Sequence, residues 1–115
     1  MKCFLVARGE VVGEMEPRAF DEGMGVVTGW FQSNSHYLAI QSIVREKYLG
    51  QVTSLIQELE LRARTEDGEQ LEPLSGLRLF DYSLELEEDA LELDIVGLPR
   101  EQFLRFWRDA HPDEA

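Results

Sequence analysis

The chain has 115 residues, of which 43% are apolar and 30% are charged, and its formal net charge at pH 7 is -12. This length and composition predict one globular domain over residues 1–115, with a core that needs no metal or disulfide to be stable. The excess of 23 acids over 11 bases argues against binding to nucleic-acid phosphates or to an anionic membrane surface, which both attract basic proteins.

Cys3 is the single cysteine, so an internal disulfide and a multi-cysteine metal site are both excluded. A membrane-spanning helix needs roughly 20 apolar residues in a row, and we find no such stretch. The short apolar run near the start is interrupted by Arg8 and Glu10, which is unlike a secretory signal. We therefore expect a cytoplasmic protein whose first residues form a strand.

Two β-rich runs, residues 2–7 and 10–16, flank Arg8-Gly9. This pattern predicts a hairpin in which Gly9 adopts a positive φ. Residues 17–23 are polar and begin with proline, so we expect them to form a loop.

Residues 24–31 are rich in valine, threonine and aromatic residues, which predicts the next strand. Gly29 inside this strand indicates a bulge or a close approach of another backbone. Trp30 and Phe31 are neighbours, so we expect them to face opposite sides of the sheet.

A helix is predicted over residues 36–49, because good N-cap residues at 33–35 precede apolar residues at helical spacing. The next segment, residues 51–58, fits both a helical and a strand pattern. We prefer a short helix that becomes a strand near Leu59, where apolar and polar residues begin to alternate strictly.

Residues 59–65 and 69–73 are predicted strands around a three-residue loop in which Gly68 is left-handed. We prefer this loop to a two-residue turn because it places Leu71 opposite Ala63, so that apolar residues oppose each other.

The last hairpin is predicted from residues 77–87 and 90–96, which alternate between apolar and acidic residues. A turn near residues 88–89 places Leu84 opposite Leu93, and therefore Glu85 opposite Glu92 on the other face.

A C-terminal amphipathic helix is predicted over residues 99–110, with Pro99 in its first turn and an apolar stripe from Phe103 to Ala110. Hairpins with few helices indicate an α+β fold. We expect an antiparallel sheet of hairpins with two or three helices packed on one face.

The acidity is concentrated in the second half of the chain. Residues 1–50 hold six acids and five bases, whereas residues 51–115 hold seventeen acids and six bases. The predicted last hairpin brings four of these acids to one outer face: Glu85, Glu87, Glu92 and Asp94. Like charges opposite each other in a sheet cost roughly 0.2–1 kcal/mol per pair.

Three interpretations of this acidic face are open. It is a solvated surface that keeps the protein soluble, a docking site for a basic partner protein, or a site for a divalent cation. The spacing of the acids does not match an EF-hand loop, so we expect neither a bound metal nor another cofactor.

Motifs for catalysis are absent from the sequence, which lacks Gly-x-Ser-x-Gly, His-Glu-x-x-His and phosphate-binding loops. His36 and His111 fall at predicted helix ends, where surface or capping roles are common. Asp21 and Asp81 lie beside aromatic residues, and we interpret both as turn or ladder residues. The sequence thus favours a protein that is not an enzyme.

In size, acidity and composition the chain resembles small bacterial inhibitor and immunity proteins that neutralise a basic toxin, a resemblance of composition and not of motif. It implies a non-enzymatic binding module whose four acids meet a basic partner. One alternative is a small enzyme or ligand-binding domain with a pocket near Trp30, Tyr37 and Asp21. Another is a structural or oligomerising protein.

Overall fold

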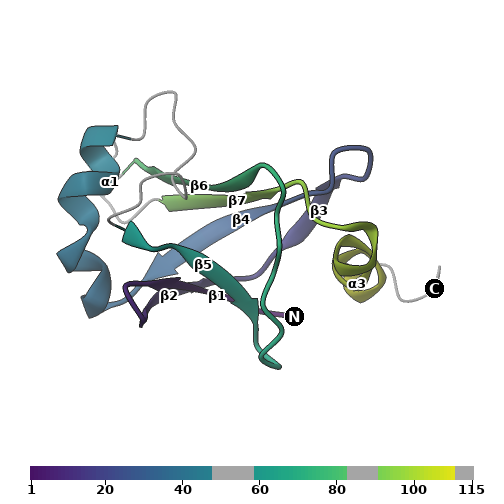
Figure 1. Ribbon diagram of the computed structural model, residues 1–115, viewed down its shortest axis with the longest axis horizontal. Coiled ribbons are helices and arrows are strands. Elements are labelled where there is room, and N and C mark those ends of the chain that lie inside the picture. The colour runs from purple at the N-terminus through teal and green to yellow at the C-terminus, as the bar shows by residue number, and fades with distance from the viewer. Residues whose placement is uncertain (48–58, 83–90, 111–115) are drawn as a thin grey trace.

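The computed structural model describes residues 1–47, 59–82 and 91–110, and Figure 1 shows a curled antiparallel sheet with few helices. The strands are β1 (Cys3–Ala7), β2 (Glu10–Met15), β3 (Arg18–Asp21), β4 (Val26–Ser33), β5 (Arg62–Thr65), β6 (Gly76–Asp81) and β7 (Leu91–Val96). The helices are η1 (Ser35–Ala39), a 3-10 helix, and the α-helices α1 (Gln41–Lys47) and α3 (Arg100–Ala110). The prediction of a mixed α and β domain with an antiparallel sheet is confirmed.

The strand order is β5-β1-β2-β4-β7-β6, and β3 pairs with β4 beside β2. One face of the curled sheet carries the core, because alternate residues of the strands are buried there. Buried examples are Leu5 on β1, Phe31 on β4, Leu79 on β6 and Leu93 on β7. In Figure 1, α1 and α3 lie near opposite ends of the sheet.

The first hairpin is confirmed. Arg8 has a φ of 52° and Gly9 a φ of 80°, so both loop residues are left-handed, as a type I′ turn requires. The register shifts between Leu5 and Val6, which marks a bulge in β2.

The polar loop predicted at residues 17–23 is wrong, because β3 occupies most of it. Arg18 pairs with Thr28, and Ala19 pairs with Val27. Pro17 lies between β2 and β3. The polar residues therefore belong to a kink and a short strand, and not to a continuous loop.

The strand predicted at residues 24–31 exists as β4, which begins two residues later and extends to Ser33. Phe31 is 3% exposed and Trp30 is 62% exposed, so these neighbours face opposite sides as predicted. A Cβ at Gly29 would lie 2.6 Å from the carbonyl oxygen of Glu16. The predicted close approach of backbone at Gly29 is confirmed.

The helix predicted at residues 36–49 is divided into η1 and α1, with a break at Ile40. Asn34 is the N-cap, and its side chain accepts a hydrogen bond from the backbone of His36 at 2.9 Å. The end of the predicted helix and the ambiguous segment 51–58 lie outside the described residues.

The loop after β5 has the predicted length, since Gly68 has a φ of 94°. The backbone N–H of Leu71 donates to the carbonyl oxygen of Ala63 at 2.9 Å, which confirms the predicted register. The strand predicted at 69–73 is wrong, because only the single bridge between Arg64 and Gln70 forms. Pro73 cannot extend such a ladder, because it has no backbone N–H.

The last hairpin has a different register from the one predicted. Leu79 lies opposite Leu93, and Glu92 lies opposite Phe80, so the predicted pairing of Glu85 with Glu92 is wrong. Leu77 and Leu79 are buried, which shows that β6 turns these leucines inward and Phe80 outward. Glu85 and Glu87 lie outside the described residues.

The C-terminal helix is confirmed as α3, which begins one residue after Pro99. Phe103 and Phe106 are each 2% exposed, and Trp107 packs against the core from a partly buried position. The three aromatic residues of the predicted stripe therefore pack on the core.

Candidate functional site

The outer face of the sheet carries a row of side chains that crosses three neighbouring strands. Trp30 of β4 pairs with Glu92 of β7, and Glu92 pairs with Phe80 of β6. All three face away from the core, because the residues beside them in each strand, such as Phe31 and Leu93, are buried. We call this set, Trp30, Glu92 and Phe80, the aromatic–carboxylate row.

The orientation of Phe80 is supported by Tyr82. Their rings stack with centroids 6.2 Å apart and planes 8° from parallel. The two rings lie two residues apart, which is the spacing that places side chains on one face at a strand end.

A second row runs beside the first. Arg18 of β3 pairs with Thr28, Thr28 pairs with Asp94, and Asp94 pairs with Arg78 of β6. The hydroxyl of Thr28 donates to Asp94 at 2.6 Å. Asp94 thus has a hydrogen-bond donor on one neighbouring strand and a guanidinium side chain on the other.

Glu92 differs from Asp94 in its surroundings. Partial burial, followed by repulsion from Asp94, raises the pKa of the Glu92 carboxyl above its usual range. Its in-register neighbours are aromatic and not basic. The negative charge of Glu92 is therefore the less compensated of the two.

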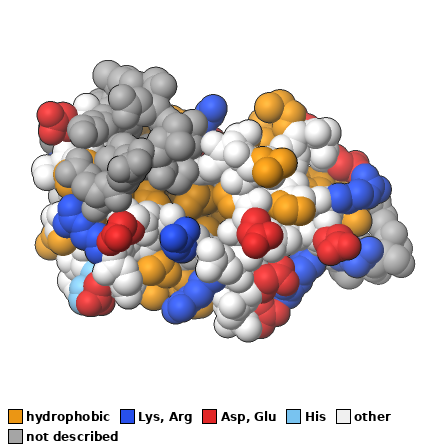
Figure 2. Space-filling view, in the orientation of Figure 1, with side chains coloured by type: hydrophobic (Ala, Val, Ile, Leu, Met, Phe, Trp, Pro, Cys, Tyr) orange, Lys and Arg blue, Asp and Glu red, His pale blue; other side chains and the backbone are white. Residues whose placement is uncertain are grey.

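The binding role of the four predicted acids stays a prediction. Glu92 and Asp94 share the outer face of β7, as predicted, and Glu85 and Glu87 lie outside the described residues. Figure 2 shows Asp and Glu interspersed with Lys and Arg over the described part of one side of the molecule. The charge of the chain is thus mixed on that side.

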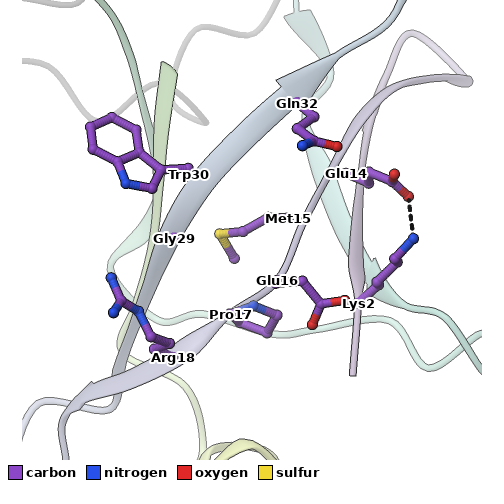
Figure 3. A pocket seen from close by; sticks show the side chains of 9 residues that line it. All are labelled: Lys2, Glu14, Met15, Glu16, Pro17, Arg18, Gly29, Trp30 and Gln32. Carbon is purple, nitrogen blue, oxygen red and sulfur yellow. Dashed lines mark ion pairs between the residues drawn. The ribbon is translucent and has the colours of Figure 1, made fainter. Parts of the chain in front are cut away.

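A hollow of about 580 Å³ lies on the outer face next to Trp30. Figure 3 shows Trp30 and Arg18 on one side of it and Glu14 and Lys2 on the other. The ammonium of Lys2 lies 3.5 Å from Glu14, so these charges are already matched.

The hollow follows from the kink between β2 and β3. The carbonyl oxygen of Glu16 lies so close to Gly29 that a side chain at this position would collide with it. Between the pairs Met15–Phe31 and Arg18–Thr28, the ladder to β4 is interrupted. The missing side chain of Gly29 therefore lets Glu16 and Pro17 approach β4.

The three residues of the alternative pocket lie in separate places. Trp30 is on the outer face, whereas Tyr37 is 1% exposed and contacts Phe31 in the core. Asp21 accepts a hydrogen bond from the backbone of Met24 at 3.1 Å, which is the turn role expected for it. The structure does not bring these three residues into one pocket.

Asp81 is the buried carboxylate of the described residues, at 1% exposure. The hydroxyl of Tyr37 donates to it at 2.8 Å, and the Nε of Arg45 lies 3.4 Å away. Burial, together with the bond to Asp81, raises the pKa of Tyr37. The ladder role predicted for Asp81 is confirmed, but its partners on η1 and α1 were not foreseen.

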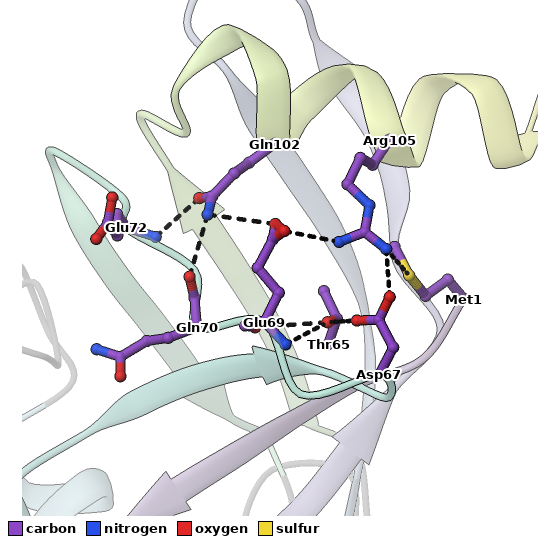
Figure 4. A network of polar contacts seen from close by, with 8 residues as sticks. All are labelled: Met1, Thr65, Asp67, Glu69, Gln70, Glu72, Gln102 and Arg105. Atoms are coloured by element: carbon purple, nitrogen blue, oxygen red, sulfur yellow. Dashed lines mark hydrogen bonds and ion pairs between the residues drawn. The ribbon is translucent and has the colours of Figure 1, made fainter.

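A polar network ties α3 to the loop after β5 (Figure 4). Arg105 donates to Asp67 at 2.6 Å and to Glu69 at 2.9 Å. Asp67 also accepts from the hydroxyl of Thr65. The bonds from Thr65 and Arg105 lower the pKa of Asp67 to about 2. This network joins two parts of the fold and leaves Asp67 with matched charge.

The other candidates for chemistry are separated from one another. Cys3 is fully buried, and burial raises the pKa of its thiol to about 12. His36 is exposed, with its Nε2 3.7 Å from Glu10. Within residues 1–47, 59–82 and 91–110, no group of three or more His, Cys, Asp or Glu side chains is placed to hold a metal ion.

No helix in the described part of the chain is both long and apolar enough to cross a membrane.

The sequence did not predict that Phe80 and Arg78 would lie beside the acids of β7. A sequence signal for this arrangement did exist, because Leu77 and Leu79 alternate with polar or aromatic residues and so form a second possible apolar face of β6.

The chain matches no protein family model, no curated protein and no solved structure.

Proposed function

We propose that the protein is a non-enzymatic acidic binding module of the cytoplasm that neutralises a basic partner protein, as immunity and inhibitor proteins do. The partner-binding residues are Glu85, Glu87, Glu92 and Asp94. The observation that supports this most directly is the placement of Glu92 and Asp94 on one outer face of β7, where Trp30 and Phe80 flank Glu92. A carboxylate that is repelled by its neighbour gains when a cation approaches.

The long-range field favours the same partner. A net charge of -12 accelerates encounter with a basic protein and slows encounter with an acidic one. The expectation that the helices pack on one face of the sheet belongs to this proposal, because such packing leaves the opposite face open to a partner.

Affinity capture from the source lysate tests the proposal. The immobilised chain is incubated at low and at high salt, and bound proteins are identified by mass spectrometry. We expect a basic protein that is retained at low salt and released at high salt, because exposed charges are screened beyond about 8–10 Å.

A charge-matched pair of variants locates the site. The first variant neutralises the proposed site through Glu85→Gln, Glu87→Gln, Glu92→Gln and Asp94→Asn. The control neutralises four exposed acids elsewhere, at Glu46, Glu60, Glu72 and Glu101. Capture lost in the first variant and kept in the control supports the proposal. Equal capture by both variants, or no salt-sensitive protein with the natural chain, refutes it.

A further inference from the structure

We infer that the aromatic–carboxylate row is a receptor for one arginine side chain of the basic partner, held over Glu92 between Trp30 and Phe80. This inference rests on the proposed function and specifies the group that the partner must present. The row supplies the two features that recognise a guanidinium, which are aromatic side chains and a carboxylate whose described in-register neighbours are not basic.

The spacing of the row suits this occupant. Adjacent strands of a sheet lie about 4.8 Å apart, so the attachment points of Trp30 and Phe80 lie about that distance on either side of Glu92. Trp30 and Phe80 are therefore the lateral neighbours of Glu92 on this face, and a cation bound above Glu92 can approach a ring centroid to the distance of about 6 Å that cation–π attraction requires.

Trp30 is available for such a contact because 62% of its surface is exposed. Tryptophan is among the residues that dominate binding energy at interfaces. The stacked Tyr82 holds the ring of Phe80, so part of the receptor is already ordered.

The charges around the row favour Glu92 as the anchor. Asp94 accepts the hydroxyl of Thr28 and lies opposite Arg78. On the strands that flank β7, the base nearest to Glu92 is Arg78. Arg78 pairs with Asp94 and not with Glu92. An arriving cation gains more at Glu92 than at Asp94, because the charge of Glu92 is the less compensated.

Arginine suits the row better than lysine. Its planar guanidinium stacks on an indole and donates two parallel hydrogen bonds to a carboxylate, whereas an ammonium is a compact and strongly hydrated charge. We expect a lysine ligand to bind more weakly at this site.

An NMR titration with a defined probe tests the inference. The probe is the peptide acetyl-glycyl-arginyl-glycine amide, and its control contains citrulline, which has the same shape without the charge. The arginine peptide should shift the indole N–H of Trp30 and the backbone amide of Glu92 in a saturable way. The citrulline peptide should shift them little.

Three variants assign the roles. Glu92→Gln should weaken the arginine peptide about tenfold, the effect expected for one charge-assisted hydrogen bond. Trp30→Leu should weaken it about threefold, as expected for an exposed cation–π contact, and Trp30→Phe should preserve most of the affinity. The matched control, Glu101→Gln, changes an exposed acid on α3 and should leave binding unchanged.

Equal binding of the two peptides, or unchanged affinity in Glu92→Gln, overturns the inference. Shifts centred on Glu14 and Lys2 also overturn it, because they would place the ligand in the hollow beside β2. Capture of a basic protein that survives in Glu92→Gln, without peptide binding to the natural chain, removes the inference and leaves the proposed function standing. If the natural chain captures no protein in a salt-sensitive way, the proposed function is refuted.

Discussion

Replacing Gly29 with alanine should destabilise the fold, because this glycine allows the kink beside the hollow. An ideal Cβ at Gly29 would lie 2.6 Å from the carbonyl oxygen of Glu16 and 2.7 Å from the Cγ of Met15. The first contact is with backbone, which cannot rotate away. Overpacking of this kind costs about 1–3 kcal/mol.

The matched control is Gly23→Ala. A Cβ at Gly23 would meet only the side chain of Asp21, at 3.4 Å. Restricting the unfolded chain there stabilises the protein by about 0.4–1 kcal/mol. We therefore expect the two alanine variants to differ by about 1.4–4 kcal/mol in free energy of unfolding, with Gly29→Ala the less stable.

Thermal unfolding followed by circular dichroism measures this difference. An unfolding entropy of about 2.1 cal/mol/K per residue gives about 0.24 kcal/mol/K for this chain, so that 2 kcal/mol corresponds to about 8 °C in Tm. Equal Tm values for the two variants would contradict the close approach of Glu16 to Gly29, and with it the explanation of the hollow.

Three further outcomes are expected. The pKa of Asp67 is about 2 in the folded state and about 4 when unfolded, so its stabilising effect is complete above pH 4 and is lost as the pH falls toward 2. Urea unfolding between pH 2 and 5 should show this loss, and Asp67→Asn should flatten it. Cys3, with a pKa of about 12 and no exposed surface, should react with iodoacetamide only at the rate of unfolding; fast labelling of the native protein would contradict its burial. Tyr37→Phe removes a bond to the buried Asp81 and should cost about 1.5–3 kcal/mol in urea unfolding, whereas in an Asp81→Asn background the cost should be smaller, and an equal cost in both would exclude the coupling.

Local turn chemistry was the most predictive part of the sequence. Arg8-Gly9 and the loop ending at Gly68 were placed correctly, because a positive φ favours glycine and fixes the register of the adjoining strands. The alternation of Trp30 and Phe31 followed from strand geometry alone. These predictions depend on neighbours in the chain and not on distant contacts.

The errors arose where packing against the core, and not the turn, decides which residues of a strand pair. Residues 77–82 offer one apolar face through Leu77 and Leu79 and another through Phe80 and Tyr82, so periodicity alone could not choose between them. In the structure Leu77 and Leu79 face the core. This register places Phe80, and not Glu85, opposite Glu92.

The candidate site could likewise be predicted only in part. The sequence singled out the acids of β7 and Trp30 separately, and it did not show which of Trp30 and Phe31 faces outward. The row of Trp30, Glu92 and Phe80 needs two pairings: that of β4 with β7, which are distant in sequence, and the register between β7 and β6. Tyr37 and Asp81, 44 residues apart, were joined by the same kind of long-range pairing.

The most direct measurement of the binding proposal is the pKa of Glu92, followed through its side-chain carboxyl carbon by NMR, with and without the arginine peptide. The charged groups nearest in register are Asp94 on the same strand and Arg78 on β6. We expect a pKa above the usual glutamate value of about 4.3 in the free protein, and a fall toward or below that value when the peptide is saturating, because a bound cation favours the ionised form. A Glu92 pKa that is ordinary in the free protein, or that the peptide does not lower, would contradict a role for this carboxylate in binding a cation.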